Sequence, residues 1–274
     1  MRLSLVVTTY ERPDALAAVL ATAAAQRQWP AEIIVADDGS GPATREVVAA
    51  FAAQAPAPVA HVRQDHDGFR AARLRNLAIA AARGDYLVFV DGDMLLHPEF
   101  IADHRRAARP GCFVQGVRIP LDAEATKAAL AAARGAPGAV PRHARGLRRI
   151  WALHSPALAR CSARIGNAVV ATKSCNLAAW RDDLLAVNGF NHAMVGWGPE
   201  DKELCARLGH LGRHRRALVF GGIAWHLHHP PATRDRRARN EAILAATRRE
   251  RTVRCEHGLA EVAQSTMQDG EMCL

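Results

Sequence analysis

Two acidic residues, Asp91 and Asp93, give the clearest chemical signal in the sequence, because they directly follow the apolar run 86–90. Residues i and i+2 of an extended chain point the same way, so both carboxylates can reach one cation. Gly92 between them leaves room for a ligand to approach the backbone. Mg²⁺ held by few carboxylates keeps positions open for phosphate oxygens, and Mn²⁺ also accepts imidazole ligands. A turn after a strand also favours Asp and Gly, so the pair alone leaves both interpretations open.

A histidine-rich stretch near residue 226 offers a further ligand. The segment 220–230 predicts a strand on which His226 and His228 alternate. Imidazole is a frequent ligand of manganese and of zinc. The chain has no HExxH or CxxC spacing, which a zinc site would favour. A lone histidine is more often structural, but the acidic pair favours His226 as the third metal ligand, ahead of His228.

A second polar group lies in the segment 196–204, where a glycine-flanked Trp197 precedes Pro199, Glu200 and Asp201. Pro199 predicts the start of a helix, and acidic residues in a first helical turn are stabilised by the helix dipole alone. Trp197, in contrast, has no evident core partner in its loop. An aromatic ring can pack against the C–H face of a sugar while neighbouring carboxylates bind the hydroxyls of that sugar, so the group also fits a saccharide site.

The elements that would position these groups alternate between short apolar runs and longer amphipathic ones, which is typical of an α/β sheet. Strands are predicted at 3–8, 32–36, 59–63 and 86–90. One helix is predicted to start at Pro13, a second to follow the turn at 37–40 and end at about residue 53, and a third to span 69–83. Ligands of open α/β sheets bind outside the carboxyl ends of the strands. Polar turns at 8–10, 37–38 and 91–93 follow three of these strands and predict a binding crevice there. Neither GxGxxG nor GxxxxGK[ST] is present at the first turn.

Composition narrows the protein class further. The 274 residues are 49% hydrophobic and fit one large domain or two small ones. No apolar run approaches about 20 residues, and the start is too short for a secretory signal, so we expect a cytoplasmic protein with reduced cysteines. The formal charge of +9 favours anionic partners, but 5% aromatic residues argue against a stacking surface for nucleic acid.

Taken in order along residues 2–230, these motifs resemble those of a known family. The first half resembles a family 2 GT-A glycosyltransferase in its segments 6–13, 37–40, 68–70, 75–76 and 84–93. The second half, through 188–190, 196–201 and His226, is similar to the region shared by β-1,4-galactosyltransferases and bacterial chondroitin-type polymerases. The resemblance implies a Rossmann-like, mostly parallel sheet flanked by helices. It also implies an inverting transferase that uses a nucleotide sugar, most often UDP-linked, with Mn²⁺ or Mg²⁺.

The resemblance also implies roles for individual residues. The implied nucleoside pocket consists of Thr8, Tyr10, Glu11 and Asp38, with Arg70 and Asn76 nearby. The resemblance implies that Asp91 contacts the ribose and the metal, and that Asp93 and His226 bind the metal. It also implies that Trp197 and Glu200 contact the sugars. Asp201 is the implied catalytic base, which would take the proton of the attacking hydroxyl. Such a base contributes roughly 10²–10⁴ in rate.

The predicted organisation is a catalytic domain at 1–232 and a basic helix with a tail at 233–274. Residues 122–164, rich in Ala and Arg, predict a helical, partly mobile excursion near the acceptor site. Eight arginines between 233 and 254 suggest contact with the inner face of an anionic membrane, where a lipid-linked saccharide of bacterial surface glycan synthesis would serve as acceptor. A nucleotidyltransferase and a non-catalytic basic binding module remain as alternatives.

Overall fold

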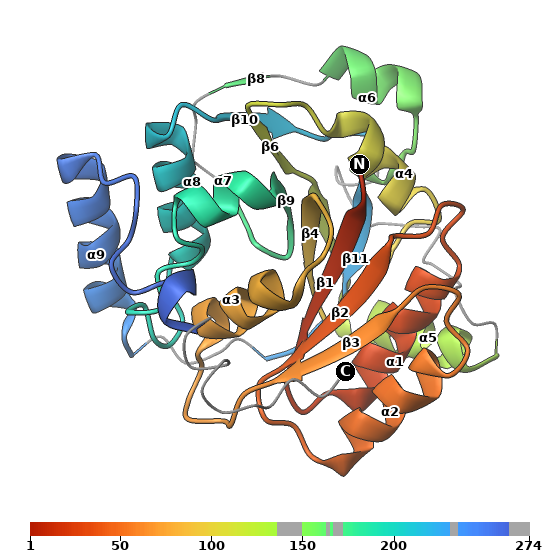
Figure 1. The fold of residues 1–274 in the computed structure, drawn as a ribbon. Helices are drawn as coiled ribbons and strands as arrows, with labels where there is room; N and C mark the ends of the chain where they lie inside the picture. The colour runs from red at the N-terminus through yellow and green to blue at the C-terminus, as the bar shows by residue number, and fades with distance from the viewer. Residues whose placement is uncertain (136–149, 163–164, 167–171, 231–234, 263–274) are drawn as a thin grey trace.

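The computed structural model describes residues 1–135, 150–162, 165–166, 172–230 and 235–262 (Figure 1). Its centre is an eight-stranded sheet with the order β3-β2-β1-β4-β9-β6-β10-β8. These strands are β1 (Leu3–Thr9), β2 (Glu32–Asp37), β3 (Val59–Arg63), β4 (Tyr86–Asp91), β6 (Cys112–Gln115), β8 (Ile165–Gly166), β9 (Asn176–Trp180) and β10 (His214–Ala217). The predicted α/β class is therefore confirmed, and the four strands expected from the first hundred residues are all present.

The pairing of the strands is mostly parallel. β1 pairs in parallel with both β2 and β4, β2 with β3, and β6 with β10. The exceptions are β8, which runs antiparallel to β10 at the edge of the sheet, and β9, which runs antiparallel between β4 and β6. β9 carries a chain segment from the second half of the sequence into the centre of the sheet, beside the strand that ends at Asp91.

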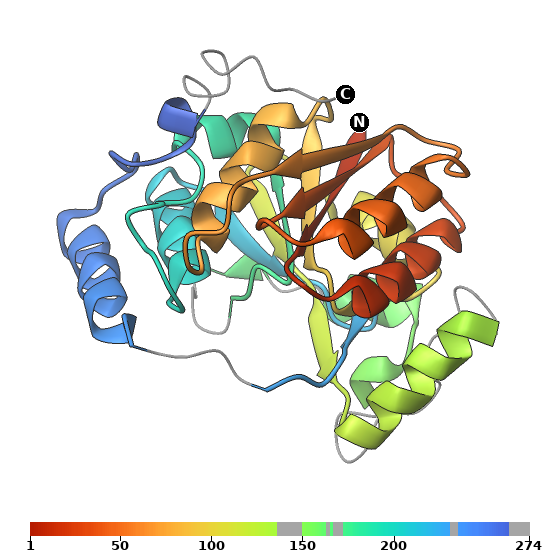
Figure 2. The same cartoon turned by 90° about the horizontal axis from the view of Figure 1, so that it is seen from below.

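Helices cover both faces of this sheet (Figures 1 and 2). The described helices are α1 (Pro13–Ala24), α2 (Pro42–Ala52), α3 (Ala71–Ala81), α4 (Phe100–Ala107), α5 (Ala123–Gly135), α6 (Pro156–Ser162), α7 (Arg181–Ala186), α8 (Glu200–His210) and α9 (Arg237–Glu250). Proline occupies the first turn of α1 and of α2. Its fixed φ suits that position, and its missing N–H costs no intrahelical bond there.

The core forms two layers because alternate residues of a strand face opposite sides. In β1, Leu5 and Val7 join the cluster that contains residues of α1 and α2, whereas Val6 joins the cluster that contains residues of α3, α7 and α8. These residues are fully buried, so β1 has no solvent-facing side. A strand buried on both faces reads as a continuous apolar run, which is the pattern in the sequence.

A smaller sheet of three strands lies beside the main one, with the order β5-β11-β7. Its strands are β5 (Met94–Leu96), β7 (Val117–Pro120) and β11 (Ile223–His226). Asn176 joins the two sheets, because its buried amide nitrogen donates to the carbonyls of Val117 at 2.8 Å and of Gly222 at 2.7 Å. Its amide oxygen lies 3.0 Å from Nε2 of His104.

The segments of unusual composition are only partly described. Within the excursion expected at 122–164 the structure has α5 and α6, and residues 136–149 and 163–164 lie outside the described part. The basic helix predicted over 233–254 is α9, which packs against α8; the expected tail beyond residue 262 is also outside the described residues. Within the described residues, none of the helices has both the length and the apolar character needed to cross a bilayer.

We expect Asn176→Ala to destabilise the fold by roughly 2–4 kcal/mol, because two buried carbonyls and a buried imidazole lose their partner. Urea unfolding of the purified protein measures the change. Gln54→Ala is the matched control, since Gln54 is exposed and its substitution should change the unfolding free energy by no more than about 0.5 kcal/mol. Equal unfolding midpoints for the two variants would contradict the role of Asn176 in joining the sheets.

Candidate active site

The carboxyl ends of three neighbouring strands meet at one edge of the main sheet. Thr8 of β1 is in register with Asp91 of β4, and Thr9 is in register with Asp37 of β2. The turns that follow are tied together, since the N–H of Asp38 donates to the carbonyl of Thr9 at 3.0 Å. The three polar turns singled out from the sequence therefore lie together, as predicted.

Asp93 is the centre of a candidate metal site. Its Oδ2 lies 3.5 Å from Nε2 of His226 and 3.3 Å from Nε2 of His229. One ligand atom from each of the three residues lies within 4.8 Å of the other two. The second carboxylate oxygen, Oδ1, is buried and has no hydrogen-bond partner. Such an unsatisfied acceptor is costly without a ligand, so the donor set fits a divalent cation.

The small sheet explains how residues so distant in sequence meet. β11 runs antiparallel to β5, and His226 is in register with Met94, the residue after Asp93. The N–H of Leu227 donates to the carbonyl of Asp93 at 2.9 Å, which fixes the chain leaving β11 against the acidic turn. His229, three residues after His226 along the chain that leaves β11, also reaches Asp93.

The electrostatic environment of Asp93 and His226 favours the binding of a metal ion. Burial lowers the pKa of His226 to about 3, helped by the neighbouring guanidinium of Arg118. The imidazole is therefore neutral and keeps a lone pair for a metal ion. Burial, with the negative charge of Asp91 as the second cause, raises the pKa of Asp93 to about 6. A cation would stabilise the ionised carboxylate and lower that pKa again.

The other candidate ligands have different surroundings. Asp91 accepts from Oγ1 of Thr8 at 3.0 Å and from the guanidinium of Arg75 at 3.2 Å, and it is not part of the three-residue cluster. His228 is exposed, and only its backbone N–H is bonded, to Oγ1 of Thr126. Sequence reasoning missed His229, because nothing in the pattern shows that the chain turns back after β11.

Arg75 connects the acidic strand end to the second polar group. Its buried guanidinium lies 3.2 Å from Asp91 and 3.0 Å from Glu200, the first residue of α8. It also lies over the ring of Phe190, 5.4 Å from the centroid. Burial raises the pKa of Glu200 to about 7, and the charge of Arg75 opposes that rise. The sequence held a signal for this residue, since Arg75 falls on the buried, alanine-rich face of α3.

Asp201 lies beside Glu200 at the start of α8 and is only partly exposed. Its carboxylate accepts from the N–H of Lys202 at 2.7 Å and from the N–H of Ser174 at 3.3 Å. Burial raises the pKa of this carboxyl above its usual value. A carboxylate with a raised pKa is a stronger proton acceptor, which suits a general base.

Trp197 occupies the loop before α8 and is 37% exposed. The guanidinium of Arg237 lies 5.7 Å from the centre of its ring. Asn240, a buried residue of α9, donates to the carbonyl of Val195 at 3.1 Å and to that of Trp197 at 3.4 Å. The arginine-rich helix therefore holds the Trp197 loop in place, a role that its composition did not indicate.

The residues expected around a nucleoside form a polar rim beyond β1 and β2. The ring of Tyr10 stacks on His66 with centroids 4.2 Å apart, and His66 Nδ1 lies 3.3 Å from Asp38. The carboxylate of Glu11 accepts from the N–H of Gly41, at the start of α2, at 2.8 Å. Arg70 contacts Asp65 and Asp67 in the loop before α3, so this loop is held by its own charges.

Asn76 differs from the other expected nucleoside contacts, because it is fully buried. Its amide group donates to the carbonyl of Phe190 and accepts from the N–H of the same residue, both at 2.8 Å. These two bonds hold the turn that contains Gly189, whose φ of +66° favours glycine. Asn76 therefore has a structural role and does not line the crevice.

Two family models match the chain in succession. Residues 4–135 match the glycosyl transferase family 2, and residues 160–230 match the domain described as the N-terminal domain of galactosyltransferase. Asp91 and Asp93 fall in the first match, and the Trp197 loop, His226 and His229 fall in the second, so the candidate metal corner draws on both matches.

Curated relatives agree with this assignment. A hyaluronan synthase of Pasteurella multocida is 33% identical over 36% of this chain, and a chondroitin synthase of Escherichia coli is 35% identical over 37%. The matched segments cover 10% and 15% of those two proteins. This chain therefore spans only a small part of the length of the relatives.

Solved structures share the fold at low sequence identity. S. aureus TarS 1-349 in complex with UDP has a TM-score of 0.63 at 15% identity. The match covers 90% of this chain and 65% of the TarS chain. A mannosyltransferase, PcManGT from Pyrobaculum calidifontis in complex with GDP-Man and Mn²⁺, has a TM-score of 0.55 at 17% identity and covers 99% and 76%. The fold is thus the GT-A fold of glycosyltransferases. By the two family matches, this chain combines a family 2 glycosyltransferase segment at 4–135 with a galactosyltransferase-type segment at 160–230.

The raised pKa of Glu200 predicts a pH-dependent stability. Its folded-state pKa of about 7 exceeds the ordinary 4.5, so the folded protein binds the proton more tightly, and the free energy of unfolding should fall as pH rises between these values. A tenfold difference in proton affinity between the folded and unfolded states corresponds to about 1.4 kcal/mol. Glu200→Gln should flatten this dependence, as measured by urea midpoints across the same window with a chelator present.

Glu241→Gln is the control for this measurement, because Glu241 is an exposed glutamate paired with Arg237 on α9. It should keep the wild-type slope. A Glu200→Gln slope that also equals the wild-type slope would show that Glu200 does not titrate in this range.

Proposed function

We propose that this chain transfers a sugar from a nucleotide-sugar donor, with UDP as the nucleotide, to a hydroxyl of a saccharide or lipid-linked saccharide, with inversion at the anomeric carbon. One observation carries the proposal: the buried guanidinium of Arg75 lies 3.2 Å from Asp91, two residues before the candidate metal ligand Asp93, and 3.0 Å from Glu200, which precedes Asp201 at the start of α8. The candidate leaving-group site and the candidate proton acceptor therefore lie on the two sides of one arginine, as a single displacement requires.

The donor side is built around Asp93, His226 and His229. A divalent cation held there, Mn²⁺ or Mg²⁺, would act as a Lewis acid that neutralises the charge developing on the departing diphosphate. Two arginines flank the same corner. Arg12 lies 3.4 Å from Oδ2 of Asp93, and Arg118 lies 3.4 Å from Nδ1 of His226. Both guanidiniums are placed to bind the outer oxygens of a diphosphate.

The nucleoside would lie farther along the strand edge. Asp91, fixed by Thr8 and Arg75, presents its remaining oxygen to the ribose. Tyr10, stacked on His66, offers an exposed ring for the base, with Asp38 behind the histidine. The UDP complex of S. aureus TarS supports a nucleotide in this fold, although the donor of this chain is a proposal.

The acceptor side is built at the start of α8. Asp201 would take the proton from the attacking hydroxyl, while Trp197 and Glu200 would hold the sugars. Two backbone N–H groups fix the orientation of the Asp201 carboxylate before the acceptor binds. The family matches leave no support for the non-catalytic binding module or for the nucleotidyltransferase.

Removing a metal ligand should abolish metal-dependent nucleotide binding. We expect Asp93→Ala and His229→Ala each to weaken Mn²⁺-dependent UDP binding by about 10-fold or more, since each removes a ligand that the other two residues cannot replace. Isothermal titration calorimetry with and without Mn²⁺ measures the effect. His228→Ala, the exposed neighbour, should bind as the wild type does, and unchanged binding by His229→Ala would remove this residue from the ligand set.

Asp201→Asn should keep UDP-sugar binding and lose turnover by roughly 10²–10⁴, because only proton transfer is affected. In the wild type, turnover should rise with pH through the raised pKa of Asp201, where the carboxylate becomes ionised. Initial rates with a saccharide acceptor measure both effects. Asp182→Asn alters an exposed aspartate in the first turn of α7 and should leave turnover unchanged; a wild-type rate for Asp201→Asn would exclude it as the base.

A further inference from the structure

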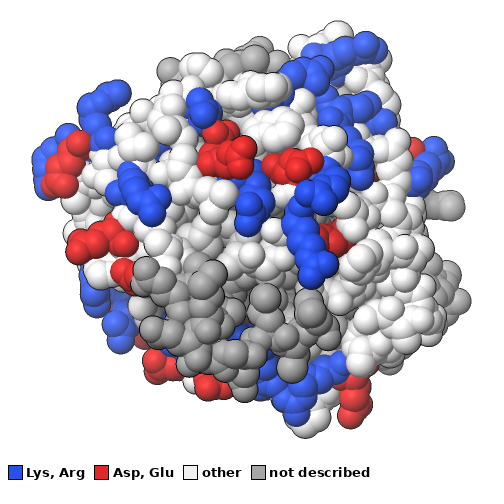
Figure 3. All heavy atoms as spheres, viewed as in Figure 1, with Lys and Arg blue, Asp and Glu red and all other residues white. Residues whose placement is uncertain are grey.

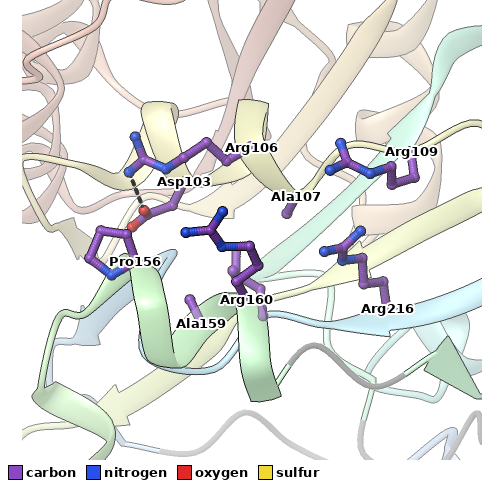
Figure 4. A pocket seen from close by; sticks show the side chains of 9 residues that line it. Asp103, Arg106, Ala107, Arg109, Pro156, Ala159, Arg160 and Arg216 are labelled. Atoms are coloured by element: carbon purple, nitrogen blue, oxygen red, sulfur yellow. Dashed lines mark hydrogen bonds and ion pairs between the residues drawn. The ribbon is translucent and has the colours of Figure 1, made fainter.

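A pocket with apolar walls and several arginines lies outside the candidate active site, between α4, α6 and β10 (Figure 4). Its volume is about 370 Å³, and four of its lining residues are arginines. They are Arg106 and Arg109 from the end of α4, Arg160 from α6 and Arg216 from β10. In Figure 3 the Lys and Arg side chains gather towards the upper right, where Figure 1 shows α4 and α6.

Arg106 is paired with Glu99 and Asp103, but two other arginines of this pocket have no carboxylate partner among the described residues. Asp103, the acidic residue of the lining, is already occupied by Arg106, His154 and the N–H of Gly222. Within the described part of the chain, Arg160 and Arg216 form no hydrogen bond or ion pair. Guanidinium groups that converge without carboxylate partners form a binding site for a phosphate group.

The chain that leads into α6 is unusually apolar on its surface. Four of the nine large hydrophobic side chains exposed by the described residues lie here: Ile150 at 57%, Trp151 at 47%, Leu153 at 53% and Leu158 at 43%. Scattered exposed residues need no explanation, but a group this close together marks an interaction surface. Tryptophan in particular favours the boundary between hydrocarbon and water.

Apolar anchors and a phosphate-binding pocket occur on the same element. Pro156, Ala159 and Arg160 of α6 line the pocket, whereas Leu158 is exposed on another side of that short helix. A soluble phosphate would use the arginines and leave the apolar residues in water. A bilayer containing anionic lipids would use both, since lipid phosphates lie directly above the hydrocarbon.

The pocket is separate from the catalytic crevice. The charge of Arg216 acts on Tyr86, the first residue of β4, whereas Asp91 is the last residue of that strand. Five steps of a strand at about 3.3 Å each span roughly 16 Å. The pocket therefore lies towards the opposite end of the strands and does not hold the donor.

The arginine-rich helix α9, which the sequence suggested for membrane contact, lacks such anchors. Its larger apolar residue Leu244 is buried, and no large hydrophobic side chain of α9 is among those exposed by the described residues. Asn240 and Arg237 are used to hold the Trp197 loop. Its remaining arginines supply charge alone.

We propose that residues 150–160 and the arginine pocket form a membrane-docking surface, with Trp151 and its apolar neighbours in the interface and a lipid phosphate held by Arg109, Arg160 and Arg216. The docking surface itself requires no activity of the crevice.

Sedimentation with vesicles tests this proposal. The wild type should pellet with vesicles of phosphatidylcholine and phosphatidylglycerol and remain in the supernatant with phosphatidylcholine alone. Trp151→Ser, and separately the double variant Arg160→Ala with Arg216→Ala, should each reduce the partition coefficient about tenfold or more. Circular dichroism and the thermal midpoint confirm folding, and Trp151→Ser alters an exposed residue that the fold does not need.

The matched control is Arg248→Ala with Arg249→Ala, which removes the same charge from exposed positions of α9. It should partition as the wild type does. Equal losses for the two double variants would reduce the effect to net charge and overturn the assigned surface. Failure of the wild type to pellet would overturn membrane docking. This would hold even if glycerol 3-phosphate raised the thermal midpoint, because the pocket would then bind a soluble phosphate and not a lipid.

Discussion

The buried guanidinium of Arg75 is the interaction on which the rest of the site depends. It lies on α3 between Asp91, at the end of β4, and Glu200, at the start of α8. Buried carboxylates are stable only when they are paired, and losing one partner of a buried pair costs about 3–5 kcal/mol. This side chain therefore ties the end of β4, in the family 2 segment, to the start of α8, in the galactosyltransferase-type segment, beside the strand pairings of β9 with β4 and of β11 with β5.

Asp93 and Asp201 are both carboxyls whose pKa burial raises, but their neighbours differ. Around Asp93 lie the unprotonated imidazole of His226 and the guanidinium of Arg12, with the negative charge of Asp91 nearby. Around Asp201, the backbone N–H groups of Ser174 and Lys202 hold the carboxylate. In the proposed reaction the first environment would suit an anionic leaving group and the second a proton acceptor.

The sequence predicted what depends on local patterns and missed what depends on packing. β1, β2 and β4 could be located because their apolar runs end in polar turns, and Pro199 does directly precede α8. His229 could not be assigned, because its role arises from where the chain after β11 packs, whereas Arg75 was given no role although its place on the buried face of α3 was a signal. The structural role of Asn76 was missed because its partner, Phe190, is distant in sequence.

The antiparallel pairing of β5 with β11 has a consequence for how the protein matures. Asp93 belongs to the first half of the chain, whereas both imidazoles arrive close to the end of the second match. Closing so long a loop is slow in comparison with forming the local βαβ units. During synthesis the first half of the chain can therefore become ordered well before the candidate metal corner exists.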